Sequence, residues 1–168
     1  MSEVLTRREP VPADPVSGRG VVVRALPPHA RFSLRARSAA DLAALLGRPV
    51  PMKIGDTDNG LLCLGPDEWF LLAPAGTTVS APEGSPVAVT DISDRNIGIS
   101  LEGPRAGEVL SAGCPIDFDH FGVGRATRTI FETVEIIVLR DAEDRYHVEV
   151  WRSIAPWLWT AFETVAKE

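Results

Sequence analysis

The chain has 168 residues, of which 45% are hydrophobic and 24% charged, and a formal net charge of -6 at pH 7. This length suffices for a single domain with its own core, and the acidic balance argues against a broad electrostatic footprint for nucleic acid. The longest apolar runs fall far short of the roughly 20 residues that a membrane-spanning helix needs, so we expect neither nucleic acid nor a membrane as a partner.

The N-terminal segment, residues 1–19, combines Pro, Gly, Asp and Arg with little periodicity, which is typical of a mobile arm. Its start carries an early acid, Glu3, and prolines follow where a secretory signal would have an apolar core, so we expect a cytoplasmic protein. In that compartment Cys63 and Cys114 are expected to be separate reduced thiols. The globular part, a single domain, is expected over residues 20–168.

Alternation and turn residues define the elements that follow. In chain order we expect strands at 21–23 and 32–36, a helix over 38–47, strands at 61–64, 69–73, 87–92 and 97–101, a short helix opened by Pro104, strands at 129–140 and 145–151, and a C-terminal helix after Ser153. Strands followed by a helix, occurring about twice, predict an α+β fold with helices packed on a mostly antiparallel sheet.

Local signals mark the helix ends. Ser38 is a good N-cap with Asp41 three residues later, and Gly47 stands where the first helix should stop. Pro104 suits the first position of the short helix. Ser153 is the expected cap of the last helix, which has an apolar stripe. This stripe comprises Ile154, Trp157, Leu158, Ala161, Phe162 and Val165.

Residues that often carry chemistry do not form a convincing constellation here. The three histidines are widely separated and have no helical or hairpin spacing, so no metal site is predicted. We interpret Asp117 to His120 as a polar loop and not as an acid–base pair. Residues 121–127 lack the strand, helix and lysine–serine ending of a phosphate loop, and Arg125 and Arg128 are expected on an exposed strand face.

Tryptophans crowd the corner between the last strand and the last helix. Trp157 fits the apolar stripe, and Trp159 is about 200° further round the helix, so one of the two should face outward. Tryptophan beside arginine is a frequent interface anchor. We therefore take Trp151, Arg152 and Trp159 as candidate interface residues. Packing in a small satellite core and a π-stacking folate pocket are the alternatives.

Three blocks carry a family resemblance between about Leu61 and Val165. They are Leu-Gly-Pro-Asp-Glu-Trp-Phe-Leu-Leu at 64–72, the stretch 91–118 that begins Asp-Ile-Ser-Asp-Arg-Asn, and Trp-Arg-Ser-Ile-Ala-Pro-Trp-Leu-Trp at 151–159. Together they resemble the gamma subunit of heterotetrameric sarcosine oxidase. The resemblance implies two interlocked β-α-β halves like those of an aminomethyltransferase folate-binding domain.

The resemblance also implies a function. The family's complexes demethylate sarcosine oxidatively, with FAD, FMN, NAD and tetrahydrofolate on other subunits, and this chain has no dinucleotide fingerprint of its own. We therefore expect a non-catalytic subunit without cofactor, metal or catalytic residues, which packs against the alpha-type subunit in a complex with beta- and delta-type subunits. The alternative is a stand-alone folate-binding protein of one-carbon metabolism.

Overall fold

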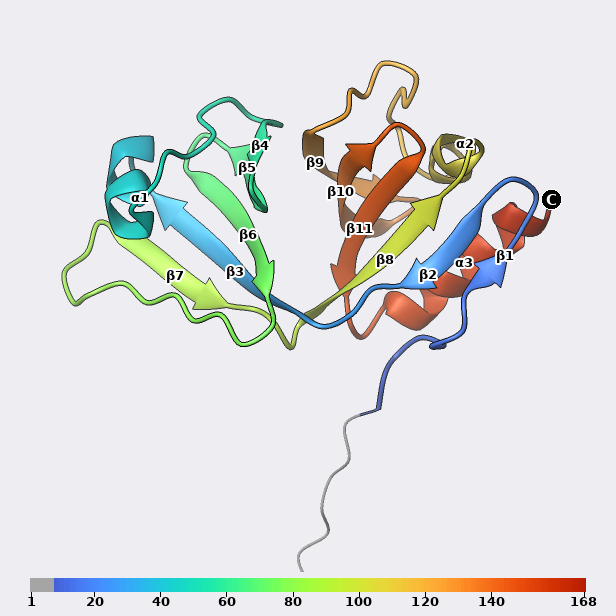
Figure 1. Ribbon diagram of the computed structural model, residues 1–168, viewed down its shortest axis with the longest axis horizontal. Helices are drawn as coiled ribbons and strands as arrows, with labels where there is room; N and C mark the ends of the chain where they lie inside the picture. The colour runs from blue at the N-terminus through green and yellow to red at the C-terminus, as the bar shows by residue number, and fades with distance from the viewer. Residues whose placement is uncertain (1–7) are drawn as a thin grey trace, which may run out of the picture.

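The computed structural model describes residues 8–168, which form two antiparallel sheets that lean toward each other, with helices on their outer faces (Figure 1). The first sheet has six strands, in the order β1 (Val16–Ser17), β2 (Val22–Ala25), β8 (Asn96–Glu102), β11 (Arg145–Trp151), β10 (Val134–Ala142) and β9 (Arg125–Phe131). The second has five, in the order β4 (Thr57–Asp58), β5 (Leu61–Gly65), β6 (Glu68–Pro74), β3 (His29–Ala36) and β7 (Val87–Asp91).

The two sheets exchange strands between the halves of the chain. Strand β2 pairs with β8 in the first sheet, and the chain then crosses to β3 in the second. Pro27 and Pro28 stand at this crossing, where prolines, which lack an amide proton, cannot continue a sheet ladder. The chain returns to the first sheet between β7 and β8. The α+β class with interlocked halves is thereby confirmed.

Helix α1 (Ala39–Leu46) lies on the outside of the second sheet (Figure 1). The Ser38 hydroxyl accepts a hydrogen bond from the Asp41 amide at 3.1 Å, and Gly47 ends the helix with a left-handed φ of 65°. Both ends of this helix are as predicted. Leu42 on its inner side is fully buried against the sheet.

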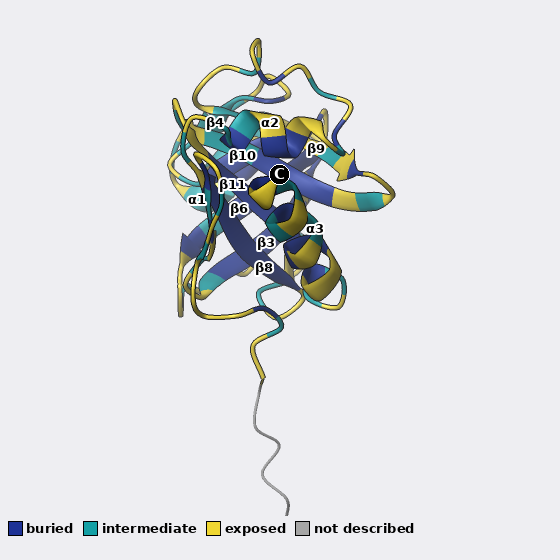
Figure 2. Cartoon of the chain, turned by 90° about the vertical axis from the view of Figure 1, so that its right-hand side faces the viewer, coloured by how far each residue is buried: buried dark blue, intermediate teal, exposed yellow. Residues whose placement is uncertain are grey.

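Helices α2 (Ala106–Ser111) and α3 (Ala155–Lys167) cover the outer face of the first sheet, and their buried sides face the strands (Figure 2). Ile99 and Leu101 of β8 lie in the core beneath them, as their alternation predicts. The prediction that Ser153 caps α3 is wrong. Ile154 takes the N-cap position and makes no side-chain capping hydrogen bond, and Pro156 lies in the first turn.

A third, smaller apolar cluster fills the space between the two sheets. Its buried members are Leu62, Phe70, Ala126 and Ile137. Both sheets contribute, since Leu62 and Phe70 belong to β5 and β6 and the other two to β9 and β10. This cluster and the ion pairs described below hold the sheets together.

The single strand expected over 129–140 is wrong. Strand β9 ends at Phe131 and β10 begins at Val134, and the two form a hairpin in which these residues pair. Glu132 makes the turn with a φ of 53°. Glycine and asparagine are the usual residues at such a φ, so the residues at this point carry no turn signal.

The folded part also starts before the expected boundary at residue 20. Val11 is buried, β1 pairs with β2, and the Arg19 amide donates to the carbonyl oxygen of Ala166 in α3 at 2.8 Å. Gly18 permits this close approach, because a Cβ there would lie 2.0 Å from the same carbonyl oxygen. Residues 1–7 of the expected mobile arm lie outside the described residues.

Candidate functional site

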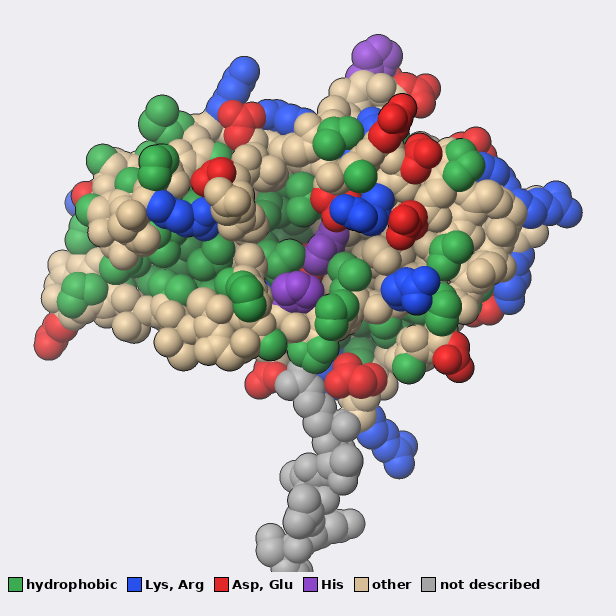
Figure 3. Space-filling view, in the orientation of Figure 1, with side chains coloured by type: hydrophobic (Ala, Val, Ile, Leu, Met, Phe, Trp, Pro, Cys, Tyr) green, Lys and Arg blue, Asp and Glu red, His purple; other side chains and the backbone are tan. Residues whose placement is uncertain are grey.

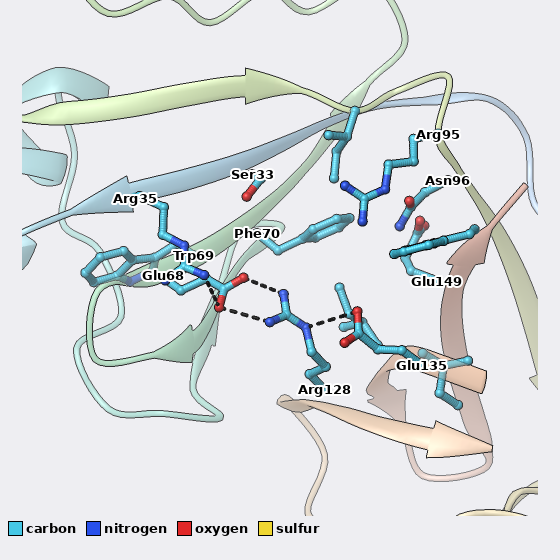
Figure 4. Close-up of a pocket in the computed structure, with 14 residues that line it drawn as sticks. Ser33, Arg35, Glu68, Trp69, Phe70, Arg95, Asn96, Arg128, Glu135 and Glu149 are labelled. Atoms are coloured by element: carbon cyan, nitrogen blue, oxygen red, sulfur yellow. Dashed lines mark hydrogen bonds and ion pairs between the residues drawn. The ribbon is translucent and has the colours of Figure 1, made fainter. Parts of the chain in front are cut away.

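A cleft of about 370 Å³ lies between the two sheets, beside the small apolar cluster. Its walls come from β3 and β6 on one side and from β9, β10 and β11 on the other, with residues 92–96 between them. Figure 4 shows that arginine, glutamate and asparagine side chains meet around the ring of Phe70. This concentration of charged groups between two sheets makes the cleft the first place to look for function.

Glu68 is the centre of one charged network in the cleft. Its carboxylate accepts two hydrogen bonds from Arg128, one of them 3.0 Å long, and forms an ion pair with Arg35 at 3.1 Å. Arg128 in turn approaches Glu135 at 3.7 Å. Donating hydrogen bonds to the Glu68 carboxylate raises the pKa of Arg128. Since Glu68 belongs to β6 and Arg128 to β9, the network joins the two sheets.

A second network lies deeper and joins the same sheets. Arg31 of β3 donates to Glu149 of β11 over 2.6 Å, and both side chains are only 3% exposed. His147 Nε2 lies 2.7 Å from the other oxygen of Glu149. Burial alone raises the pKa of Glu149, but the hydrogen bond and charge of His147 and the charge of Arg31 together lower it below its ordinary value.

Two histidines that are distant in sequence come together at this network. The rings of His29 and His147 are 6.4 Å apart in an edge-to-face arrangement, and Figure 3 shows two histidines side by side in the middle of the molecule. His29 Nδ1 also lies 2.8 Å from the carbonyl oxygen of Pro27. Within residues 8–168, no group of three or more His, Cys, Asp or Glu residues could hold a metal ion.

Arg95 and Trp151 form the outer wall of the cleft. The guanidinium of Arg95 lies 4.3 Å from the centre of the Trp151 ring, within the range of a cation–π contact. Within residues 8–168 no hydrogen bond or ion pair of the Arg95 side chain is found. Next to it, the amide oxygen of Asn96 is buried without a hydrogen-bond partner in the same part of the chain.

A second cavity, of about 470 Å³, lies on the other side of the crossing strands. Residues 9–13 of the N-terminal segment and residues 25–29 form much of its wall, together with Arg152. Arg152 donates to the carbonyl oxygen of Arg8 and approaches Glu9 at 3.7 Å. The side chain of this candidate interface residue is therefore engaged within the chain.

The other two candidate interface residues have different surroundings. Trp151 is 40% exposed and lines the first cleft, so it is available at the surface. Trp159, expected to face outward, is 3% exposed and packed in the core, whereas Trp157, expected in the core, is 42% exposed. The prediction that the two face different ways holds, but their assignment is reversed. The buried face of α3 comprises Ala155, Leu158, Trp159, Phe162 and Ala166.

The remaining sequence-based interpretations concern side chains away from the cleft. Cys63 and Cys114 are free, buried thiols, as expected, and burial raises the pKa of Cys114 to about 12. His120 and Asp117 bond at 2.8 Å in an exposed loop. Arg125 and Arg128, both expected on an exposed strand face, are only partly exposed, at 38% and 35%, and form ion pairs with Asp56 and Glu68.

Sequence reasoning missed both charged networks. Arg31 and Glu149 are 118 residues apart, and Glu68 and Arg128 are 60 apart. His147 and Glu149 alternate with apolar residues along β11, which is also the pattern of a strand with one solvated face. The alternation by itself cannot distinguish a strand face that is exposed to water from one that packs against a second sheet carrying complementary charges.

Comparisons with known proteins place these features in a family. Residues 35–168 match the family model described as sarcosine oxidase, gamma subunit family. The chain is 36% identical over 121 residues to sarcosine oxidase subunit gamma of an Arthrobacter species, a match that covers 65% of this chain and 60% of that protein. It is 32% identical over 152 residues to the protein of the same name from Corynebacterium sp. strain U-96, covering 81% and 74%.

Solved structures agree with these matches. The chain aligns with one chain of the heterotetrameric sarcosine oxidase from Corynebacterium sp. U-96 in complex with pyrrole 2-carboxylate, with a TM-score of 0.76 and 28% identity over 96% of this chain and 97% of the other. An aminomethyltransferase T of the glycine cleavage system from Bartonella henselae aligns with a TM-score of 0.65 at 15% identity, covering 87% of this chain and 46% of that one. The second likeness concerns the fold alone.

Proposed function

Because the chain belongs to the sarcosine oxidase gamma subunit family, we propose that it is the non-catalytic gamma-type subunit of a heterotetrameric sarcosine oxidase-like complex. In this proposal it packs against the alpha-type subunit, and the beta- and delta-type subunits complete the assembly. The observation that carries it is the alignment over 96% of the chain with one chain of a heterotetrameric sarcosine oxidase.

The charged residues of the cleft support a structural role. Glu68 and Arg128, and likewise Arg31 and Glu149, bond to each other across the two sheets. Groups held in this way stabilise the relative position of the sheets. A rigid two-sheet body would give the larger subunits a defined surface to pack against.

In the proposed complex the chemistry takes place on other subunits. Sarcosine is oxidatively demethylated there with FAD, FMN and NAD, and tetrahydrofolate accepts the one-carbon unit. The chain described here contributes no cofactor-binding residue to these steps. Within residues 8–168 no helix is long and apolar enough to cross a membrane.

Purification from the native host tests the proposal. An affinity tag on the chain should recover three further subunits together with flavin absorbance, and the complex should oxidise sarcosine. Recovery of the chain alone, with tetrahydrofolate bound to it, would favour the stand-alone folate-binding protein instead. A control strain expressing the tag on an unrelated protein identifies nonspecific recovery.

A further inference from the structure

Three strongly exposed apolar side chains lie close together at one end of the molecule. Met52, Ile54 and Val123 are 80%, 55% and 57% exposed, more than any other large apolar side chain among residues 8–168. The first two belong to the loop between α1 and β4, and the third belongs to the loop before β9, so both sheets contribute (Figure 1). Single exposed apolar side chains are common, but a contiguous group marks an interaction surface. We call these three residues the apolar patch.

Hydrogen bonds between the two loops hold the apolar patch together. The guanidinium of Arg125 donates to the carbonyl oxygen of Ile54 at 2.9 Å. Thr57 Oγ1 donates to the carbonyl oxygen of Gly124 at 2.8 Å. Because Val123 directly precedes two of these bonded residues, its backbone is held beside that of Ile54.

The backbone that carries Met52 is fixed on both sides. Trp69 Nε1 donates to the carbonyl oxygen of Pro51 at 2.7 Å, and the Asp56 amide donates to the carbonyl oxygen of Lys53 at 2.9 Å. The ring of Pro51 restricts the backbone further, since it fixes φ. A rigid backbone lowers the entropy that a contact must overcome, so these exposed apolar groups are preorganised for binding.

A depression of about 440 Å³ lies beside the apolar patch. Its lining includes the apolar side chains of Val50, Pro51 and Val123 and the ion pair between Arg125 and Asp56. Side chains that anchor a protein interface characteristically fill such pockets. The surface therefore offers protruding apolar side chains and, next to them, a hollow that can receive a side chain of a partner.

The charges around the apolar patch indicate which partner fits it. Lys53 lies within the loop, is exposed, and makes no ion pair with residues 8–168. The nearby acids are already paired, Asp56 with Arg125 and Asp58 with Arg48. A second copy of this chain would bring a second Lys53 without a free carboxylate, and the net charge of -6 on each copy would oppose association. The complementary partner is a different protein, with an apolar surface and a carboxylate opposite Lys53.

We infer that the apolar patch is the surface by which this chain docks on the alpha-type subunit, which places a carboxylate against Lys53. The inference rests on the proposed function and adds to it the location of the contact. Met52 and Ile54 enter the surface of the alpha-type subunit, and a side chain of that subunit fills the depression beside Val123. Because the patch belongs to loops of both sheets, the docked subunit contacts both sheets at once.

Matched variants of the tagged chain, purified from the native host, test this surface. The double variant of Met52→Asp with Ile54→Asp should recover at least about tenfold less flavin per chain than the parent, the effect of removing interface anchors. Ala75→Asp adds the same kind of charge at an exposed position after β6, outside the patch, and should recover as much as the parent. Both proteins should keep the parent's melting temperature, since the replaced side chains are exposed.

Crosslinking identifies the partner directly. The photoreactive residue p-benzoylphenylalanine at position 52 of the assembled complex should crosslink the chain to the alpha-type subunit, and the same residue at position 75 should not. Lys53→Gln should raise the Kd for the partner subunits by about two- to fivefold and reduce the dependence of this Kd on salt, as the loss of an exposed charge pair does.

The outcomes separate this inference from the proposed function. If the parent recovers its flavin-containing partners and the folded double variant recovers them equally well, the apolar patch is not the docking surface and the subunit proposal stands. A crosslink from position 52 to any protein other than the alpha-type subunit, a second copy of this chain included, or to none, also overturns the inference. A parent chain that recovers no partner overturns both proposals.

Discussion

Arg31 Nε on β3 donates a hydrogen bond to Glu149 Oε2 on β11 over 2.6 Å, and this contact ties the second sheet to the first. Both side chains are 3% exposed, so water cannot solvate either charge if its partner is removed. A buried ion pair contributes little relative to an apolar pair of the same volume, but removing Arg31 leaves the buried Glu149 carboxylate without its guanidinium partner and with the His147 ring still beside it. The pair therefore matters most through the cost of breaking it.

The first prediction concerns this pair. Arg31→Met should destabilise the chain by about 3 to 5 kcal/mol, and the double variant with Glu149→Leu should recover much of that loss. Urea unfolding followed by tryptophan fluorescence measures both. Arg145→Met is the matched control, because its ion pair with Asp141 is exposed and should be worth about 1 kcal/mol or less. Similar losses in Arg31→Met and Arg145→Met would contradict the prediction.

The second prediction concerns acid stability. The pKa of Glu149 is lower in the folded chain than its ordinary value of 4.5, so folding favours the ionised carboxylate. This contribution is fully present above about pH 4.5 and is lost as the pH falls through the lower, folded value. Urea unfolding at a series of pH values should therefore show a steeper acid loss of stability in the parent chain than in Glu149→Gln.

Other carboxylates remain in the Glu149→Gln variant, and they determine how far its stability still falls at acid pH. Asp91, through its hydrogen bond from Ser93, and Asp117, through its hydrogen bond with His120, also have lowered pKa values. If the two proteins lost stability in parallel between pH 5 and pH 3, the linkage assigned to Glu149 would be incorrect.

The third prediction uses the two tryptophans of α3. Trp159→Ala should cost about 3 to 5 kcal/mol, because the side chain is buried in the main core. Trp157→Ala should cost about 1 kcal/mol, since the ring is 42% exposed and contacts the Phe131 ring edge-to-face, at 6.4 Å between centroids. Thermal unfolding of both variants measures this order, and the reverse order would contradict it.

The exposed member of this pair also tests the proposed assembly. If Trp157 anchors a partner, Trp157→Ala should make the free energy of binding to the partner subunits less favourable by about 2 kcal/mol, the level that defines a hot spot. Titration of the partner subunits with labelled chain measures it. Thr160→Ala, an exposed position on the same helix, serves as the control and should bind normally.

The fourth prediction concerns Cys114. Burial raises its pKa to about 12, so almost no thiolate is present near neutral pH, and thiolate is the reactive form. Iodoacetamide at pH 8 should modify the native chain slowly and should react with both cysteines once urea unfolds it. Mass spectrometry of the intact chain counts the added groups. Rapid modification of Cys114 in the native protein would show that the side chain is accessible.

The fifth prediction concerns the glycine facing the buried network. A Cβ on Gly98 would lie 2.9 Å from His147 Nε2 and 3.1 Å from Glu149 Oε1, both too close without movement. Gly98→Ala should therefore destabilise the chain by about 1 to 3 kcal/mol, as overpacking does. In Gly122→Ala the new Cβ would be 3.6 Å from its nearest neighbour, so unfolding measurements should show little change.

Sequence alone determined the features that depend on neighbours along the chain. The cap at Ser38, the left-handed Gly47 and the alternation of Ile99 with Leu101 are local signals, and each predicted an element that the structure contains. The α+β class followed from their order. The three sequence blocks carried the family resemblance, which the family model and the solved structures support.

Only the tertiary structure decided which polar residues meet. Arg31 and Glu149 are separated by 118 residues, and their pairing depends on two sheets that exchange strands at Pro27–Pro28. The same holds for Trp157 and Trp159: periodicity places them on different faces of α3, but the packing of the helix on the first sheet determines which face is buried. Local propensity acts over a few residues, whereas burial is a property of the assembled layers, so the sequence determined most of the elements, and the packing of the two sheets determined the cleft.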